Sequence, residues 1–159
     1  STYQSDSSEV LDMDSVLLNH VISFRSNVEK ITSALGNPDS IVPNTDECGT
    51  FFGIDSLRKF YFGRTWFEVN GDTAVIRDID LRDGRFNLSL DRVRLNGRTS
   101  IADIAHAFPK SASQAYPPGD EERMGVMLVR IKTQPECDDY WVLSFQDGEL
   151  ARIEYWIPC

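Results

Sequence analysis

The alternation of hydrophobic and polar residues through the middle of the chain predicts a meander of antiparallel β-strands. The apolar-rich segments of this meander are residues 57–62, 65–69, 73–81 and 86–90. Asn70-Gly71 and Asp83-Gly84 separate neighbouring segments, and such dipeptides favour tight turns because they reach positive φ at low cost. The second turn places Ile79 opposite Leu88. We therefore expect residues 73–90 to form a hairpin within one sheet.

A short amphipathic helix is predicted just before this meander. Ser26 and Glu29 have the spacing of a capping box, in which the serine caps the first turn and the glutamate reaches back to it. The apolar residues that follow at helical spacing are Val28, Ile31, Ala34 and Leu35. Gly36 ends the pattern, which predicts a helix of about ten residues.

The same order of helix and strands returns in the second half of the chain. A second capped helix is predicted from Thr99 to Phe108, and strands follow at residues 125–131, 140–146 and 149–157. We interpret this recurrence as a tandem duplication of a unit of roughly 75 residues. The predicted organisation is a flexible leader at 1–18, a first helix-plus-sheet unit at 19–95 and a second at 96–159.

The last hairpin is the most regular stretch of the chain. With Asp147-Gly148 as a two-residue loop, Phe145 faces Leu150 and Leu143 faces Arg152. In that register both faces are apolar, with Trp141, Leu143, Phe145, Leu150 and Trp156 on one and Tyr140, Val142, Ile153, Tyr155 and Ile157 on the other. A sheet covered by helices on one side needs only one apolar face. The second face is therefore expected to meet another layer or a partner.

The predicted fold class is α+β, with two tandem repeats of a short helix followed by an antiparallel meander. We expect them to form one curved sheet with helices on one face. This arrangement over nearly the whole chain resembles the β-lactamase inhibitory protein family. At residue level, Phe145-x-Asp147-Gly148-x-Leu150, with Trp156 six residues further on, is similar to the terminal hairpin of that family.

The resemblance implies an exposed concave face that can clasp another protein. It also implies that Trp156 matches an aromatic residue on the binding face. The family pairs its cysteines within each repeat, whereas neither unit of this chain has two cysteines in the corresponding places.

The three cysteines are too few for a disulfide scaffold and lack the spacing of metal ligands. In the tight-turn register Cys137 lies opposite Pro158, and a single bulge would bring it opposite Cys159. We therefore expect a Cys137–Cys159 disulfide, with Cys48 as a buried thiol, in an oxidising compartment. The alternative is three reduced thiols in a cytosolic protein.

The net charge of −9 argues against nucleic acids and anionic membrane surfaces as partners, because both require a basic face. It favours a basic protein partner. No apolar run approaches the length of a transmembrane segment. The small, polar residues 1–9 fit a tether that remains after export as well as a cytoplasmic amino terminus.

The sequence contains no recognisable catalytic constellation. His20 and His106 are the two histidines, and neither accompanies a nucleophile in a known motif. Residues 78–84 resemble a calcium loop only in part, because the fifth position is Arg82 and the glycine is seventh. We therefore predict a non-enzymatic protein with no cofactor and no metal site.

The candidate binding residues are aromatic and belong to the central strands: Tyr61, Trp66, Trp141, Tyr155 and Trp156. We expect half of the aromatic residues to fill the core and half to form an exposed patch. The favoured hypothesis is a non-enzymatic extracytoplasmic protein, free or lipid-anchored, that binds or inhibits another protein through this aromatic face. One alternative is a cup for a small molecule or peptide on the same face. Another is a carboxylate-dependent hydrolase, for which a buried carboxylate pair with raised pKa would be the sign.

Overall fold

The computed structural model describes residues 9–53, 57–90, 93–119 and 123–159. Its fold is α+β with mostly antiparallel strands, which confirms the predicted class. The helical segments are the 3-10 helix η1 (Met13–Ser15), α1 (Val28–Leu35), α2 (Ile101–Ala107) and α3 (Pro109–Ser113). The strands of the amino-terminal half are β1 (Leu17–Leu18), β2 (Ile22–Ser23), β3 (Arg25–Asn27), β4 (Ser40–Pro43), β5 (Arg58–Phe62), β6 (Thr65–Asn70) and β7 (Thr73–Asp80). The later strands are β8 (Leu88–Leu90), β9 (Val93–Leu95), β10 (Val126–Lys132), β11 (Tyr140–Gln146) and β12 (Glu149–Trp156).

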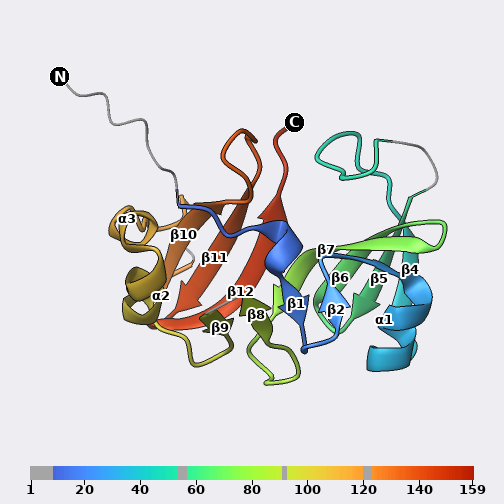
Figure 1. The fold of residues 1–159 in the computed structure, drawn as a ribbon, viewed down its shortest axis with the longest axis horizontal. Helices are drawn as coiled ribbons and strands as arrows, with labels where there is room; N and C mark the ends of the chain where they lie inside the picture. The colour runs from blue at the N-terminus through green and yellow to red at the C-terminus, as the bar shows by residue number, and fades with distance from the viewer. Residues whose placement is uncertain (1–8, 54–56, 91–92, 120–122) are drawn as a thin grey trace.

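A large antiparallel sheet carries both meanders (Figure 1). Its strand order within the described residues is β10-β11-β12-β7-β6-β5-β4, and β3 also pairs with β7. The two meanders meet where β12 pairs with β7, with Ile153 opposite Ile79 at the centre of the contact. In both halves of the chain a helical segment precedes an antiparallel meander, which has four strands, β4 to β7, in the first half and three, β10 to β12, in the second. The duplication itself stays a prediction.

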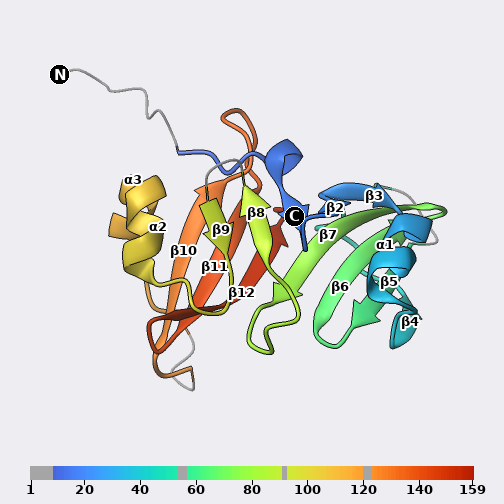
Figure 2. The ribbon, with the colours of Figure 1, turned by 60° about the horizontal axis from the view of Figure 1, so that its bottom comes forward.

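The two meanders share one sheet as expected, but the predicted pairing of Ile79 with Leu88 is wrong. The edge of β7 that this hairpin would use is taken by β12. After Leu81 the chain leaves the large sheet, and β8 instead pairs with β1 and β9. The result is a small second sheet of order β2-β1-β8-β9, of which β8 and β9 lie in front of β11 and β12 in Figure 2.

Residues 9–18 do not form the flexible leader that we predicted, whereas residues 1–8 lie outside the described residues. Leu11, Val16 and Leu18 are buried in the common core, because β1 builds the second sheet. The carbonyl of Leu11 also accepts a hydrogen bond of 3.0 Å from the indole Nε1 of Trp141. The segment before residue 19 therefore belongs to the fold.

Each of the two predicted helices begins one residue later than its capping pattern indicated. Asn27 caps α1 and accepts a 2.7 Å hydrogen bond from the Lys30 amide, because Ser26 is paired with β7 as part of β3. Ser100 caps α2 in a reciprocal capping box with Asp103. Gly36, at a φ of 83°, ends α1.

A β-bulge in β12 changes the predicted register of the last hairpin. Phe145 faces Leu150 as predicted. Arg152, however, lies opposite Ser144 and not opposite Leu143 as predicted, so Ala151 is the extra residue of the bulge. The regular register would have placed the Arg152 guanidinium beside Leu143, on the buried face, where an unpaired charge is costly. The bulge turns this charge outward and reverses the faces of all residues that follow in β12.

Because of this reversal the hairpin has one apolar face and one polar face. The expectation of two apolar faces is therefore wrong. The inward residues are Trp141, Leu143, Phe145, Leu150, Ile153 and Tyr155, and all are buried in a single core with residues of α1, α2 and the second sheet. A similar bulge lies in β7, where Trp66 faces Asp78 and Phe67 faces Ile76, which leaves Arg77 as the extra residue.

A buried ion pair holds the loop that precedes β5 against the large sheet. Glu68 is fully buried and accepts hydrogen bonds from the amides of Phe51 and Phe52, at 3.0 and 2.8 Å. Arg77 donates to the same carboxylate and to the carbonyl of Gly49, at 2.9 Å for the latter. A carboxylate that is charged and buried requires such partners.

The disulfide connects Cys48 to Cys159, so the predicted Cys137–Cys159 pairing is wrong. Beyond Trp156 the chain leaves β12 and runs beside the loop that Glu68 holds, where Gly49 lies next to the Ile157 carbonyl. Cys137 is the free cysteine of the described residues, and its thiol donates to Gln134 Oε1 at 3.4 Å within the β10–β11 connection.

We expect removal of the disulfide to destabilise the fold strongly. The bridged cysteines are 111 residues apart, and closing a loop of this length contributes about 5 kcal/mol in the chain-entropy model. Urea unfolding of Cys48→Ala/Cys159→Ala should reveal most of this loss, whereas Cys137→Ala should change the free energy of unfolding little. Thiol counting in denatured, unreduced protein should find a single free thiol.

Glu68→Gln tests the buried ion pair. The neutral amide keeps the shape of the side chain but leaves the Arg77 guanidinium without its countercharge, so we expect a loss of about 3 kcal/mol in unfolding free energy. Glu47→Gln, at an exposed position in the same loop, is the matched control and should change stability little. Equal stabilities of the two variants would contradict this role for Glu68.

Candidate functional site

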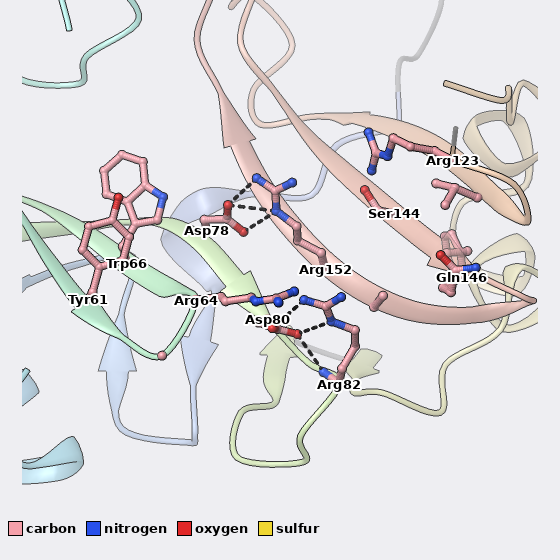
Figure 3. Close-up of a pocket in the computed structure, with 14 residues that line it drawn as sticks. Tyr61, Arg64, Trp66, Asp78, Asp80, Arg82, Arg123, Ser144, Gln146 and Arg152 are labelled. Atoms are coloured by element: carbon pink, nitrogen blue, oxygen red, sulfur yellow. Dashed lines mark hydrogen bonds and ion pairs between the residues drawn. The ribbon is translucent and has the colours of Figure 1, made fainter. Parts of the chain in front are cut away.

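The outer face of the large sheet is the face opposite the core, and it carries Trp66, Asp78, Arg152 and Trp156. A pocket of about 450 Å³ opens on this face where the two meanders join (Figure 3). Its charged lining residues are Arg64, Asp78, Asp80, Arg82, Arg123 and Arg152. Tyr61 and Trp66 form part of its wall.

Arg152 bridges two carboxylates at the junction of the meanders. Asp78 on β7 lies directly opposite Glu154 on β12, a position in which like charges destabilise a sheet. The Arg152 Nε donates to the two oxygens of Asp78 at 2.7 and 2.8 Å, and its Nη2 contacts both Asp78 and Glu154. Figure 3 shows this guanidinium beside Asp78.

Burial has the largest effect on the pKa of Asp78. It raises the pKa of this carboxyl above the usual value, and the hydrogen bonds from Arg152 offset only part of that effect. The same hydrogen bonds raise the pKa of Arg152, which therefore stays charged. The ion pair thus fixes the geometry of the pocket floor at a cost in desolvation.

Asp80 and Arg82 form a second ion pair at the lower rim of the pocket in Figure 3. The Arg82 Nε and Nη2 each donate to Asp80 at 2.8 Å, a two-pronged arrangement that orients the guanidinium. These hydrogen bonds hold the pKa of Asp80 below its usual value. The positive charge of Arg64 lowers that pKa further.

Two aromatic pairs lie on the outer face, one on each meander. Tyr61 and Trp66 lie 6.1 Å apart between ring centroids, and Tyr140 stacks on Trp156 at 4.5 Å. Trp156 is 36% exposed, whereas Trp66, Tyr61 and Tyr140 are half-buried. Three of the five predicted binding residues, namely Tyr61, Trp66 and Trp156, are therefore on this face.

Trp141 and Tyr155 do not belong to the exposed patch that we predicted. Trp141 is fully buried, and Tyr155 is 3% exposed because the bulge in β12 turns it inward. The Tyr155 hydroxyl donates to Asp139, and its ring packs edge-on against Phe24 at 5.2 Å. Both residues are part of the core.

The sequence reasoning missed Tyr140 and the arginines of the pocket. Tyr140 pairs with Trp156 across the strands only in the bulged register. Arg64 and Arg123 precede β6 and β10, and Arg82 follows β7, so no sequence spacing links them. In the sequence, Arg152 signalled the bulge, because the unbulged register would have placed its charge on the buried face.

Within the described residues, no group of three or more histidine, cysteine, aspartate or glutamate side chains is arranged to hold a metal ion. Likewise, no helix there has the length and apolarity needed to cross a membrane. Comparison of the chain with family models, curated proteins and solved structures finds no match. The resemblance to the β-lactamase inhibitory protein family therefore stays a hypothesis.

Carboxyl titration by NMR should separate the two aspartates of the pocket. Asp78 should titrate above 3.8, so its contribution favours folding at acid pH and is lost as the pH rises through its raised pKa. Asp80 should titrate below 3.8, so its contribution is present above that pH and is lost as the pH falls through its lowered pKa. Asp80→Asn should therefore reduce stability at neutral pH and have little effect in strong acid. Coincident titration midpoints for Asp78 and Asp80 would contradict this assignment.

Proposed function

We propose that this protein is a non-enzymatic binding protein that captures a protein partner through the outer face of its large sheet. The observation that carries the proposal is the pair of aromatic clusters, Tyr61–Trp66 and Tyr140–Trp156, on either side of the pocket. Tyrosine and tryptophan supply much of the energy of protein interfaces, since they offer large, rigid contact areas with a polar end.

Neighbouring side chains already order the aromatic residues of this face. The Tyr140–Trp156 stack fixes the orientation of both rings, and the Arg130 guanidinium lies 4.9 Å from the Tyr140 ring centroid. On the other meander Lys59 lies 4.6 Å from the Trp66 ring centroid. Side chains that are already ordered lose less conformational entropy on binding.

Charge favours a partner that is basic overall. The chain carries a net charge of −9, and opposite net charge accelerates the encounter of two proteins. The Cys48–Cys159 disulfide is compatible with an oxidising compartment. We accordingly propose an extracytoplasmic location, with the protein either free or held by a lipid anchor.

The carboxylates of the pocket support binding in preference to hydrolysis. Asp78 is engaged by Arg152, and Asp80 is engaged by Arg82. A general acid or base needs a carboxyl group that can exchange a proton with substrate. Here both groups orient guanidinium side chains instead.

Trp156→Ala separates binding from stability. Because Trp156 is partly exposed, its loss should change the free energy of unfolding by about 1 kcal/mol or less. Trp141→Ala, in the core, should cost about 3–5 kcal/mol by the same urea measurement. In affinity capture from an extract of exported proteins, Trp156→Ala should retain about tenfold less of the partner than the native chain.

Val21→Ala is the matched control for capture. Val21 is an exposed apolar residue between β1 and β2, outside the large sheet, so its removal should leave partner retention unchanged. Equal retention by Trp156→Ala and the native chain would reject the outer face as the interface.

A further inference from the structure

The pocket at the junction of the meanders has an excess of positive charge in a strongly acidic protein. Four arginines and two aspartates line it, so the described lining residues carry a formal charge of +2. The chain as a whole carries −9. Such a local reversal of sign inside a cavity favours an anion there, because low-dielectric walls strengthen the local potential.

The two aspartates orient their arginines and leave one edge of each guanidinium unused. Asp78 takes the Nε and Nη2 groups of Arg152, whose Nη2 also contacts Glu154, and Asp80 takes the corresponding groups of Arg82. Neither Nη1 group is hydrogen-bonded to a described residue. Both guanidinium groups line the same pocket in Figure 3. Their remaining N–H donors are therefore fixed in direction before any ligand arrives.

Arg64 adds a third guanidinium that is not matched by a carboxylate. Its side chain makes no hydrogen bond or ion pair with the described residues, and Figure 3 shows it pointing towards Asp80 and Arg82. Two guanidinium groups beside a single carboxylate repel each other, and a bound oxyanion would offset this repulsion. Planar guanidinium groups match the geometry of carboxylates and phosphates.

The surroundings of the arginines favour a carboxylate on a side chain over an isolated ion. Trp66 and Tyr61 line the same pocket and offer ring surfaces next to the charged groups. An aliphatic stem can lie against these rings while its terminal group reaches the arginines. A glutamate or aspartate side chain of a protein has both parts.

We propose that this pocket receives a carboxylate side chain from the partner, bound by Arg64, Arg82 and Arg152. The proposal rests on the proposed function, since it names the chemistry of the partner at the same face. The partner is then basic overall but presents one acidic residue at the centre of the interface. Asp78 and Asp80 are positioning residues, because they act by orienting the arginines.

NMR of the arginine side-chain Nε–Hε groups tests this proposal without a known partner. The probes are N-acetylglutamate amide, its neutral counterpart N-acetylglutamine amide, and inorganic phosphate, all at constant ionic strength. We expect the glutamate probe to shift the Arg82 and Arg152 signals in a saturable manner, while the glutamine probe does not. Arg64→Gln should weaken this binding by about tenfold, because a charge-assisted hydrogen bond is lost.

Arg94→Gln is the matched control, since Arg94 is exposed on β9 and does not line the pocket. It should leave the affinity for the glutamate probe unchanged. Equal shifts with both amide probes, or equal losses in the Arg64 and Arg94 variants, would overturn the site. Saturation by phosphate at about tenfold lower concentration would assign the pocket to a free oxyanion and overturn the partner carboxylate.

The outcomes for this site and for the proposed function are distinguishable. If Trp156→Ala loses the partner while the arginines ignore the glutamate probe, the interface stands and the carboxylate site fails. If the arginines bind the probe but Trp156→Ala keeps the partner, the site stands as an anion pocket and the proposed interface fails.

Discussion

Arg152 is the side chain on which the union of the two meanders depends. The pairing of β7 with β12 sets Asp78 directly against Glu154, and these like charges would oppose the contact. Arg152 lies between them and bonds to both, so the strands can approach. The pairing in turn creates the pocket, because the walls come from different meanders. Arg152 therefore both bridges the two meanders and lines the pocket on the outer face.

Local patterns predicted the longer strands and the helix α1 well, since their causes are local. Alternation and glycine-containing turns indicated β5, β6 and β7 to within a residue or two of their bounds. Capping residues and Gly36 located α1 with similar accuracy. The hairpin turn at Asp147-Gly148 and the Phe145–Leu150 pair were also predicted correctly.

The errors share a non-local cause. The hairpin register failed because the charge of Arg152 is satisfied by Asp78, which is 74 residues away in sequence. The predicted pairing of β7 with β8 failed for a similar reason, since β12 occupies the edge of β7 that the nearer β8 was expected to take. Of the candidate site, aromatic composition indicated Tyr61, Trp66 and Trp156, but it could not identify which aromatic residues a bulge turns inward.

The central position of β12 has a consequence for the order of folding. β7 lies in the middle of the sheet, yet one of its neighbours, β12, is made more than seventy residues later in synthesis. β3 pairs with the first part of this edge, but until β12 is made the part from Asp78 to Asp80 stays unpaired, and unpaired strand edges recruit other chains. The high contact order of this pairing also predicts slow closure of the sheet.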